Sequence, residues 1–151
     1  MPLDPAVVLA LAAACAPQVA PQTLLAVAQV ESGLDPLAIG VNGPGGRAPR
    51  PRTRWEAIVQ ATGLIAAGGN MDLGLAQINS RNLGWLGLSL ADAFDPCRSL
   101  AASAQVLANG YRRAAPPAGR EQAGLRIALS YYNTGHPTRG VANRYVPRLT
   151  A

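Results

Sequence analysis

The stretch PQTLLAVAQVESG, residues 21–33, decides the class of fold. Its apolar residues recur at the spacing of one helix face, and the members of that inward stripe are Leu24, Leu25, Val27 and Ala28. Pro21 fits the first turn of a helix, and Gly33 fits the left-handed position that follows the last turn. The stretch therefore predicts a helix that begins at Pro21 and carries one acid, Glu31, in its last turn.

Capping signals predict two further helices. Asp4–Pro5 supplies an N-cap followed by a proline, which predicts a helix over residues 5–15. Thr53–Glu56 has the pattern of a capping box, and the apolar run that follows it stops at two glycines, Gly68 and Gly69. Both helices are rich in small apolar residues, as expected of closely packed helical proteins.

The rest of the chain is predicted to be helical except for one stretch. Helices are expected from Asp95–Pro96 to residue 114, over residues 120–135, and as a last turn or two within residues 140–149. Residues 71–87 have no sustained period and contain three glycines, so we expect an irregular segment there. At 151 residues and 49% hydrophobic composition, the sequence predicts a mainly α fold in a single domain, residues 1–151.

The charged residues exclude several kinds of chemistry. The chain has a net charge of +5 and no lysine, which excludes a P-loop lysine and a Schiff-base lysine. The single histidine, His136, lies in a predicted turn, and no nucleophile motif accompanies it. We expect no metal site and no cofactor. Four arginines fall within residues 45–54, which predicts a mobile, solvated loop, with a loop that contacts a ligand as the alternative.

The two cysteines and the N-terminus leave alternatives open. Cys15 and Cys97 permit either one disulfide or two buried thiols, and their spacing alone does not choose. The apolar run near the N-terminus resembles an export segment, but no positive charge precedes it. We expect it to be the first helix of the fold, with any signal peptide missing from this chain. No apolar run reaches eighteen residues, so no membrane span is predicted.

Three short motifs resemble a known family. They are ESG at residues 31–33, GLAQIN at 74–79 and ALSYYNTG at 128–135, and they match in order and spacing the signatures of soluble lytic transglycosylases. The segments around the cysteines, residues 15–33 and 95–107, resemble the peptidoglycan-opening members that serve type IV secretion systems. The resemblance implies a lysozyme-like fold with a substrate cleft, a periplasmic location, and other secretion components as partners.

The resemblance also implies a reaction. Members of the family cleave the β-1,4 bond between N-acetylmuramic acid and N-acetylglucosamine and close a 1,6-anhydro ring on the muramic sugar. Glu31 would be the only essential acid. A carboxyl group at a helix C-terminus meets the negative end of the helix dipole, which is expected to raise its pKa and keep its proton available. The nearest other acid in the sequence, Asp35, precedes a proline and is better explained as a turn residue.

Five more residues are candidates for substrate binding. The resemblance implies that Gln77, Tyr132 and Asn133 bind the N-acetyl groups and that the tyrosine touches the acid; amides and phenols suit an acetamide, which has one donor and one acceptor. Ser32 would orient Glu31 or the sugar, and Asn79 is a weaker candidate for lining the cleft. The structural alternatives are a cap-region serine for Ser32, a turn amide for Asn79 and a half-buried core aromatic for Tyr132. Ala76 stands where the family commonly has methionine, so the floor of the pocket is expected to be less filled.

Three competing functions remain at this stage. A lysozyme-type hydrolase would use the same acid but admit water, and a second positioned carboxylate would favour it. A glycan-binding assembly scaffold would hold the glycan strand without needing an acid. A nucleic-acid binder would use the arginine-rich loop, but the sequence has no recognised motif of that class.

Overall fold

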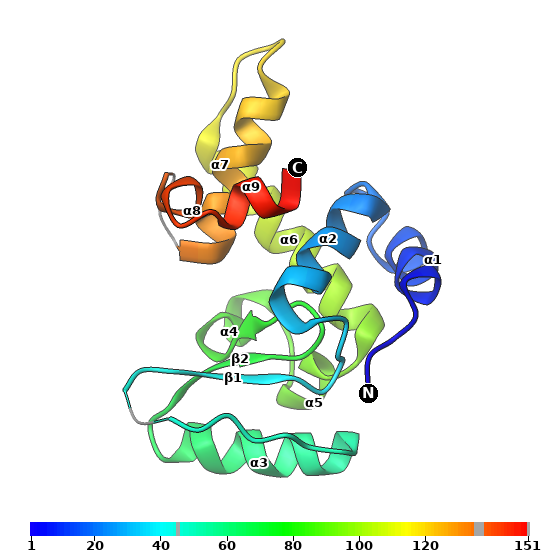
Figure 1. The fold of residues 1–151 in the computed structure, drawn as a ribbon, viewed down its shortest axis with the longest axis vertical. Coiled ribbons are helices and arrows are strands. Elements are labelled where there is room, and N and C mark those ends of the chain that lie inside the picture. Colours follow the sequence, from blue (N-terminus) through cyan, green and yellow to red (C-terminus); the bar gives the residue numbers. More distant parts are fainter. Residues whose placement is uncertain (45, 135–137, 151) are drawn as a thin grey trace. The chain divides into compact units, whose positions relative to one another are not determined.

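The computed structural model describes residues 1–44, 46–134 and 138–150. The chain forms two compact units, Met1–Ser103 and Ala104–Ala151. Helices dominate the described residues of both units, which confirms the predicted mainly α class (Figure 1). The prediction of a single domain is not decided by this division and stays a prediction.

The first unit contains the predicted N-terminal helices. Its longer helices are α1 (Pro5–Cys15), α2 (Pro21–Ser32), α3 (Arg54–Ala66) and the first part of α6 (Pro96–Ala114); short turns form η1 (Ser80–Asn82), α4 (Leu83–Leu86) and α5 (Leu90–Ala93). Asp4 accepts a hydrogen bond from the backbone N–H of Ala6 at 2.8 Å, so the predicted N-cap of α1 is confirmed.

The start of α3 differs in one detail from the predicted capping box. Thr53 Oγ1 accepts a hydrogen bond from the Glu56 N–H at 3.1 Å, as expected of the cap. The Glu56 carboxylate, however, accepts from the N–H of Arg52 at 2.8 Å, one residue earlier than the reciprocal bond of a capping box. The helix therefore begins where predicted. The Glu56 side chain also holds the residue before the cap, Arg52, by a hydrogen bond to its backbone N–H.

A small sheet corrects the prediction for residues 71–87. Strands β1 (Ile39–Asn42), β2 (Asn70–Leu73) and β3 (Ile78–Asn79) are antiparallel and lie in the order β1-β2-β3. The prediction of an irregular segment was wrong at β2 and β3, because strands of four and two residues are too short to establish a period of two.

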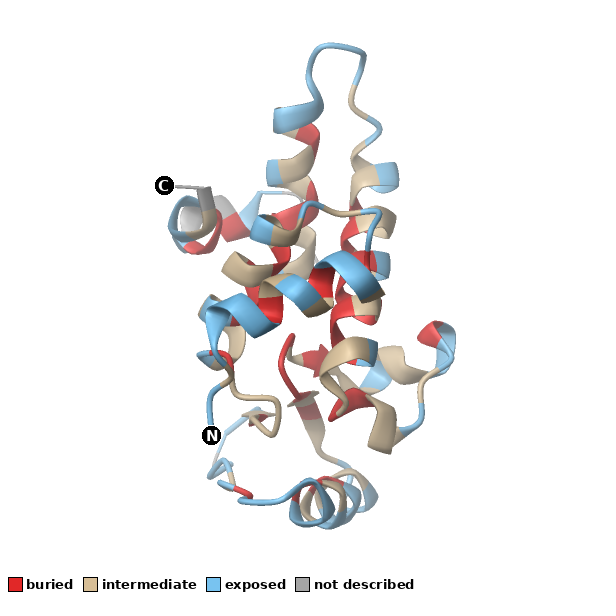
Figure 2. Cartoon of the chain, turned by 90° about the vertical axis from the view of Figure 1, so that its right-hand side faces the viewer, coloured by how far each residue is buried: buried red, intermediate tan, exposed pale blue. Residues whose placement is uncertain are grey.

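One face of this sheet belongs to the hydrophobic core. Ile39, Met71 and Leu73 are at most 5% exposed and cluster with Ala57 and Ala61 of α3. Figure 2 shows buried segments, in red, on the strands and on the helix that lies beside them. Because side chains alternate along a strand, the residues between them point to the opposite face of the sheet, away from this core.

The second unit consists of the end of α6 with α7 (Glu121–Thr134), α8 (Arg139–Ala142) and α9 (Tyr145–Thr150). Gly110 allows α6 and α7 to pack closely, since a Cβ there would lie 3.2 Å from the Ala128 Cα. The predicted end of the penultimate helix, Gly135, and the single histidine, His136, lie outside the described residues.

Cys15 and Cys97 form a disulfide bond, with their Cα atoms 5.5 Å apart. The bond joins the last residue of α1 to the first turn of α6 and encloses a separation of 82 residues. The alternative of two buried thiols therefore does not hold in this structure. In the parts of the chain that the structure describes, no helix combines the length and apolar character that crossing a membrane requires.

Candidate functional site

Glu31 lies in the last turn of α2, as predicted. Gly33 ends the helix with φ at +63°, the left-handed cap expected from the sequence. The Glu31 side chain is half-buried. Its neighbour Ser32 donates one hydrogen bond from Oγ to the Leu75 carbonyl oxygen at 2.6 Å and contacts the Ala28 carbonyl at 3.1 Å. Ser32 thereby ties the end of the acid-bearing helix to the turn that joins β2 and β3.

That turn, residues 74–77, is fastened at several points. The Gly74 N–H donates to the Ala38 carbonyl at 2.8 Å, next to the start of β1. The Ala76 N–H donates to the Ser99 Oγ at 3.1 Å, and both residues are buried. The position where the family commonly has methionine is therefore in the interior, with Ala76 only 1% exposed. Together with the Ser32 bond, these contacts hold the turn against α2, β1 and α6.

Gly74 cannot be replaced in this turn without movement of its neighbours. Its φ is +75°, and a Cβ built on it would lie 2.0 Å from the Ala93 carbonyl oxygen at the end of α5. Both the conformation and the close approach require glycine. The glycine of the GLAQIN motif is therefore explained by backbone packing.

Gln77 has a positive φ of 54°, which is uncommon for a residue other than glycine. Its side-chain Nε2 donates to the carbonyl oxygens of Ala38 at 3.1 Å and Gly74 at 3.0 Å, so both amide hydrogens are used within the protein. Its Oε1 faces Gly40, where a Cβ would lie 2.7 Å away. The predicted contact of Gln77 with an N-acetyl group stays a prediction, and Oε1 is the atom through which it would be made.

The sheet face opposite the core carries a network of amides around one carboxylate. Asn79 donates from Nδ2 to Asp72 Oδ1 at 3.0 Å and to Asn70 Oδ1 at 2.5 Å. Asn42 donates from Nδ2 to Asp72 Oδ2 at 2.9 Å. These bonds cross all three strands, and each oxygen of Asp72 accepts from an amide on a different neighbouring strand.

Sequence reasoning missed Asp72. Asp72 could have been recognised from the sequence NMDL, residues 70–73, in which polar and apolar residues alternate as they do in a half-buried strand. The acid that was considered instead, Asp35, accepts a hydrogen bond from the Leu37 N–H at 2.9 Å, as expected of a turn residue. Asp72 is therefore the carboxylate that the sheet presents on its polar face.

Tyr132 and Asn133 belong to the second unit, near the end of α7. Tyr132 is half-buried, and the Asn133 Oδ1 accepts a hydrogen bond from the Asn143 Nδ2 at 2.6 Å. Their neighbour Tyr131 has the Arg113 guanidinium 4.0 Å from its ring centroid. The Ser130 Oγ accepts from the Gly140 N–H at 2.8 Å, which packs α8 against α7. The predicted contacts of Tyr132 and Asn133 with substrate stay predictions.

Comparison with known proteins identifies the family. The model of the transglycosylase SLT domain matches residues 9–149. The chain belongs to this family. It is 46% identical over 150 residues to the type IV secretion system protein virB1 of Brucella abortus and of Brucella suis, which covers 95% of this chain and 62% of each relative. It is 45% identical over 139 residues to the protein virB1 of Agrobacterium fabrum, covering 89% and 54%.

The chain of this SLT domain spans about three-fifths of the length of the Brucella relatives. No solved structure matches it significantly.

Within the first unit of this SLT domain, two carboxylates are connected through one turn. Glu31 stands at the end of α2, which Ser32 ties to residues 74–77. Asp72 stands on β2, which leads directly into that turn. The acid-bearing end of α2 and the strand that carries Asp72 are therefore joined to the same turn.

Proposed function

We propose that this SLT domain is a peptidoglycan lytic transglycosylase with Glu31 as its catalytic acid. The observation that supports this best is the placement of Glu31 in the last turn of α2, beside a serine that fastens the helix end to the GLAQIN turn. The family match supports the reaction class. The names of the Brucella relatives support a role in a type IV secretion system. The proposed role extends to opening the cell wall in the periplasm, together with other components of that system.

The proposed reaction uses Glu31 twice. Its carboxyl proton passes to the glycosidic oxygen as the bond from C1 of the muramic sugar to that oxygen breaks, and the bonding electrons leave with the N-acetylglucosamine. The resulting carboxylate then takes the proton of the C6 hydroxyl, whose oxygen bonds to C1. The products are a 1,6-anhydro sugar and a free N-acetylglucosamine hydroxyl. Glu31 ends protonated, and no water is consumed.

Asp72 supports a second candidate, a lysozyme-type hydrolase. The sequence offered no positioned second acid, but the structure holds Asp72 between the amides of Asn42 and Asn79. A carboxylate in such a position can stabilise the positive charge that develops at C1, or direct a water to it. In the transglycosylase reaction, Asp72 would need only to stabilise the positive charge at C1. In the hydrolase reaction it would direct a water molecule, which would replace the C6 hydroxyl as the nucleophile.

Product analysis separates these candidates. Purified peptidoglycan is digested in isotopically labelled water, and the soluble fragments are identified by mass spectrometry for the wild type, Glu31→Gln and a matched control, Glu121→Gln. We expect unlabelled anhydro-muropeptides from the wild type and the control and none from Glu31→Gln. Labelled reducing ends would assign the hydrolase. Binding to the wall without release of fragments by any of the three would assign the scaffold.

A further inference from the structure

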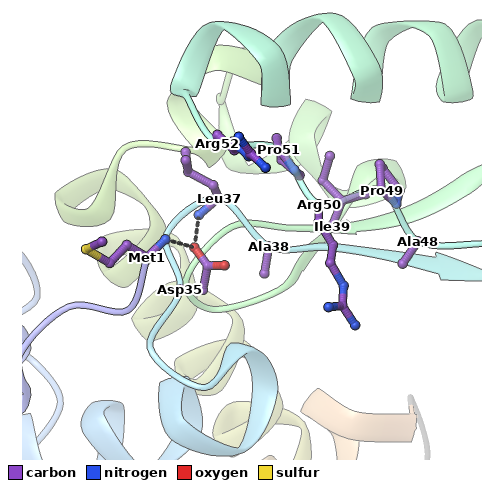
Figure 3. Close-up of a pocket in the computed structure, with 10 residues that line it drawn as sticks. All are labelled: Met1, Asp35, Leu37, Ala38, Ile39, Ala48, Pro49, Arg50, Pro51 and Arg52. Carbon is purple, nitrogen blue, oxygen red and sulfur yellow. Dashed lines mark hydrogen bonds and ion pairs between the residues drawn. The ribbon is translucent and has the colours of Figure 1, made fainter.

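A pocket of 810 Å³ lies in the first unit beside the start of β1 (Figure 3). Its walls come from the segment that follows α2 and from the arginine-rich loop that leads into α3. The residues that line it are Met1, Asp35, Leu37, Ala38, Ile39, Ala48, Pro49, Arg50, Pro51 and Arg52. The loop therefore packs against the protein as one wall of a cavity, which favours the alternative of a contact loop over a purely solvated one.

The pocket combines an apolar lining with two arginine side chains. Leu37, Pro49 and Pro51 supply rigid, apolar walls, and Pro51 is buried. Arg50 and Arg52 are exposed, and within the described part of the chain neither side chain takes part in an ion pair. In Figure 3 the Arg50 side chain extends away from α3 and is not folded onto the loop. Both guanidinium groups can therefore bind a carboxylate.

The opposite end of the pocket carries a negative charge. Asp35 accepts the Leu37 N–H at 2.9 Å with one carboxylate oxygen, and its side chain is 33% exposed (Figure 3). A partly exposed carboxylate can also accept hydrogen bonds from a positively charged amine. A ligand with carboxylates at one end and an amine at the other would complement both ends of the pocket.

The pocket is also connected to the candidate catalytic residues. Asp35 follows Glu31 by four residues, just beyond the cap of α2. The Ala38 carbonyl, in the pocket wall, accepts hydrogen bonds from the Gly74 N–H and from the Gln77 side chain. A ligand in the pocket would therefore lie against the same backbone segment that holds the GLAQIN turn.

We propose that this pocket binds the peptide stem of peptidoglycan, an inference that rests on the proposed function. The stem is a short peptide attached to the muramic sugar. It carries alanine methyl groups, free carboxylates and, in diaminopimelate-type walls, an amine. The carboxylates bind Arg50 and Arg52, the methyl groups contact the proline and leucine walls, and the amine faces Asp35. The pocket thus selects peptide-bearing glycan over bare glycan.

The test compares two substrates and two matched variants. The KM and kcat of the wild type, the double variant Arg50→Gln/Arg52→Gln and the control Arg47→Gln are measured on peptide-bearing glycan and on glycan whose stems an amidase has removed. Arg47 lies on the same loop but outside the pocket lining. We expect the double variant to raise the KM for peptide-bearing glycan, relative to that for bare glycan, by about tenfold. Arg47→Gln should leave this ratio unchanged.

A binding measurement with the free stem peptide tests the pocket even if the protein cleaves neither glycan. Calorimetry with the free tripeptide L-Ala–γ-D-Glu–diaminopimelate should give binding to the wild type and at least tenfold weaker binding to the double variant. Equal changes of KM on both substrates, or an equal effect of Arg47→Gln, would overturn the proposal, because general electrostatic attraction would then explain the arginines. Cleavage of neither substrate together with tripeptide binding would overturn the proposed function while retaining the pocket.

Discussion

The hydrogen bonds around Asp72 fix the orientation of its carboxylate. Asn42 and Asn79 bond its two carboxylate oxygens from the neighbouring strands, so the side chain is held in one orientation on the polar face of the sheet. A fixed charge needs no reorganisation when positive charge develops nearby, which is the main source of electrostatic catalysis. In the proposed reaction, Asp72 would therefore stabilise the positive charge at C1.

Replacing Asp72 by asparagine removes that charge with little change of shape. We expect Asp72→Asn to lower kcat on peptidoglycan by about a hundredfold, with the KM close to that of the wild type. The unfolding temperature should fall slightly, because the amide nitrogen of asparagine cannot accept the hydrogen bond that one carboxylate oxygen accepts from Asn42 or Asn79. Asp4→Asn is the matched control, since asparagine is as good an N-cap as aspartate and Asp4 caps α1. A kcat equal to that of the wild type would restrict Asp72 to organising the sheet.

The sequence predicted some of these residues and missed others for physical reasons. Glu31 and its glycine cap follow from helix periodicity, which is a local property of the chain. Ser32 and Gln77 were predicted only by resemblance, and their bonds to Leu75 and Ala38 join segments that lie far apart in the sequence. Asp72 was not predicted because its hydrogen-bond partners lie on two other strands, and a local sequence pattern does not indicate hydrogen bonds between strands.

Among the elements, α5 is small but supports the turn beside the acid. Its last residue, Ala93, places its carbonyl where only glycine fits at position 74. The start of α5 has a full capping box, in which Ser89 and Asp92 exchange hydrogen bonds at 3.0 and 3.1 Å. The backbone N–H of Ser89 is the main cause that lowers the pKa of Asp92 below its usual 3.8, with Arg98 and Arg54 contributing.

A lowered pKa in the folded state has a defined effect on stability. Asp92 stabilises the fold at pH values above the pKa of the unfolded chain, and this contribution is lost as the pH falls through the lower folded-state pKa. We expect the difference in free energy of unfolding between the wild type and Asp92→Asn to shrink between about pH 6 and about pH 3. Urea titrations at several pH values measure it. A difference that is independent of pH would assign the effect of Asp92→Asn to packing.

The strands illustrate why some elements could not be predicted. The helices α1, α2 and α3 of the first unit have eleven or more residues each, which is long enough for their caps and their periodicity to agree. The strands have four residues or fewer, and their pairing is decided by Gly74 and by the core contacts of Met71 and Leu73 with α3. Such elements form because of tertiary contacts, which a single sequence does not display.

At the scale of the whole chain, the disulfide links two helices that lie far apart in the sequence, α1 and α6. In the chain-entropy model, a cross-link over 82 residues stabilises the folded state by about 4 to 5 kcal/mol. We expect Cys15→Ser/Cys97→Ser, or reduction of the wild type, to lower the free energy of unfolding by roughly that amount in urea titrations. The double variant should not respond to reductant. A reduced wild type that unfolds at an unchanged urea concentration would contradict this prediction.

The same bond has a consequence for a chain that has been cut. The arginine-rich loop lies between Cys15 and Cys97 in the sequence, and Arg47 in it is exposed. A protease that cleaves after Arg47 would divide the polypeptide in two, but the fragments would remain covalently joined through sulfur. Separation of the two fragments would then require two chemical events, hydrolysis of a peptide bond and reduction of the disulfide.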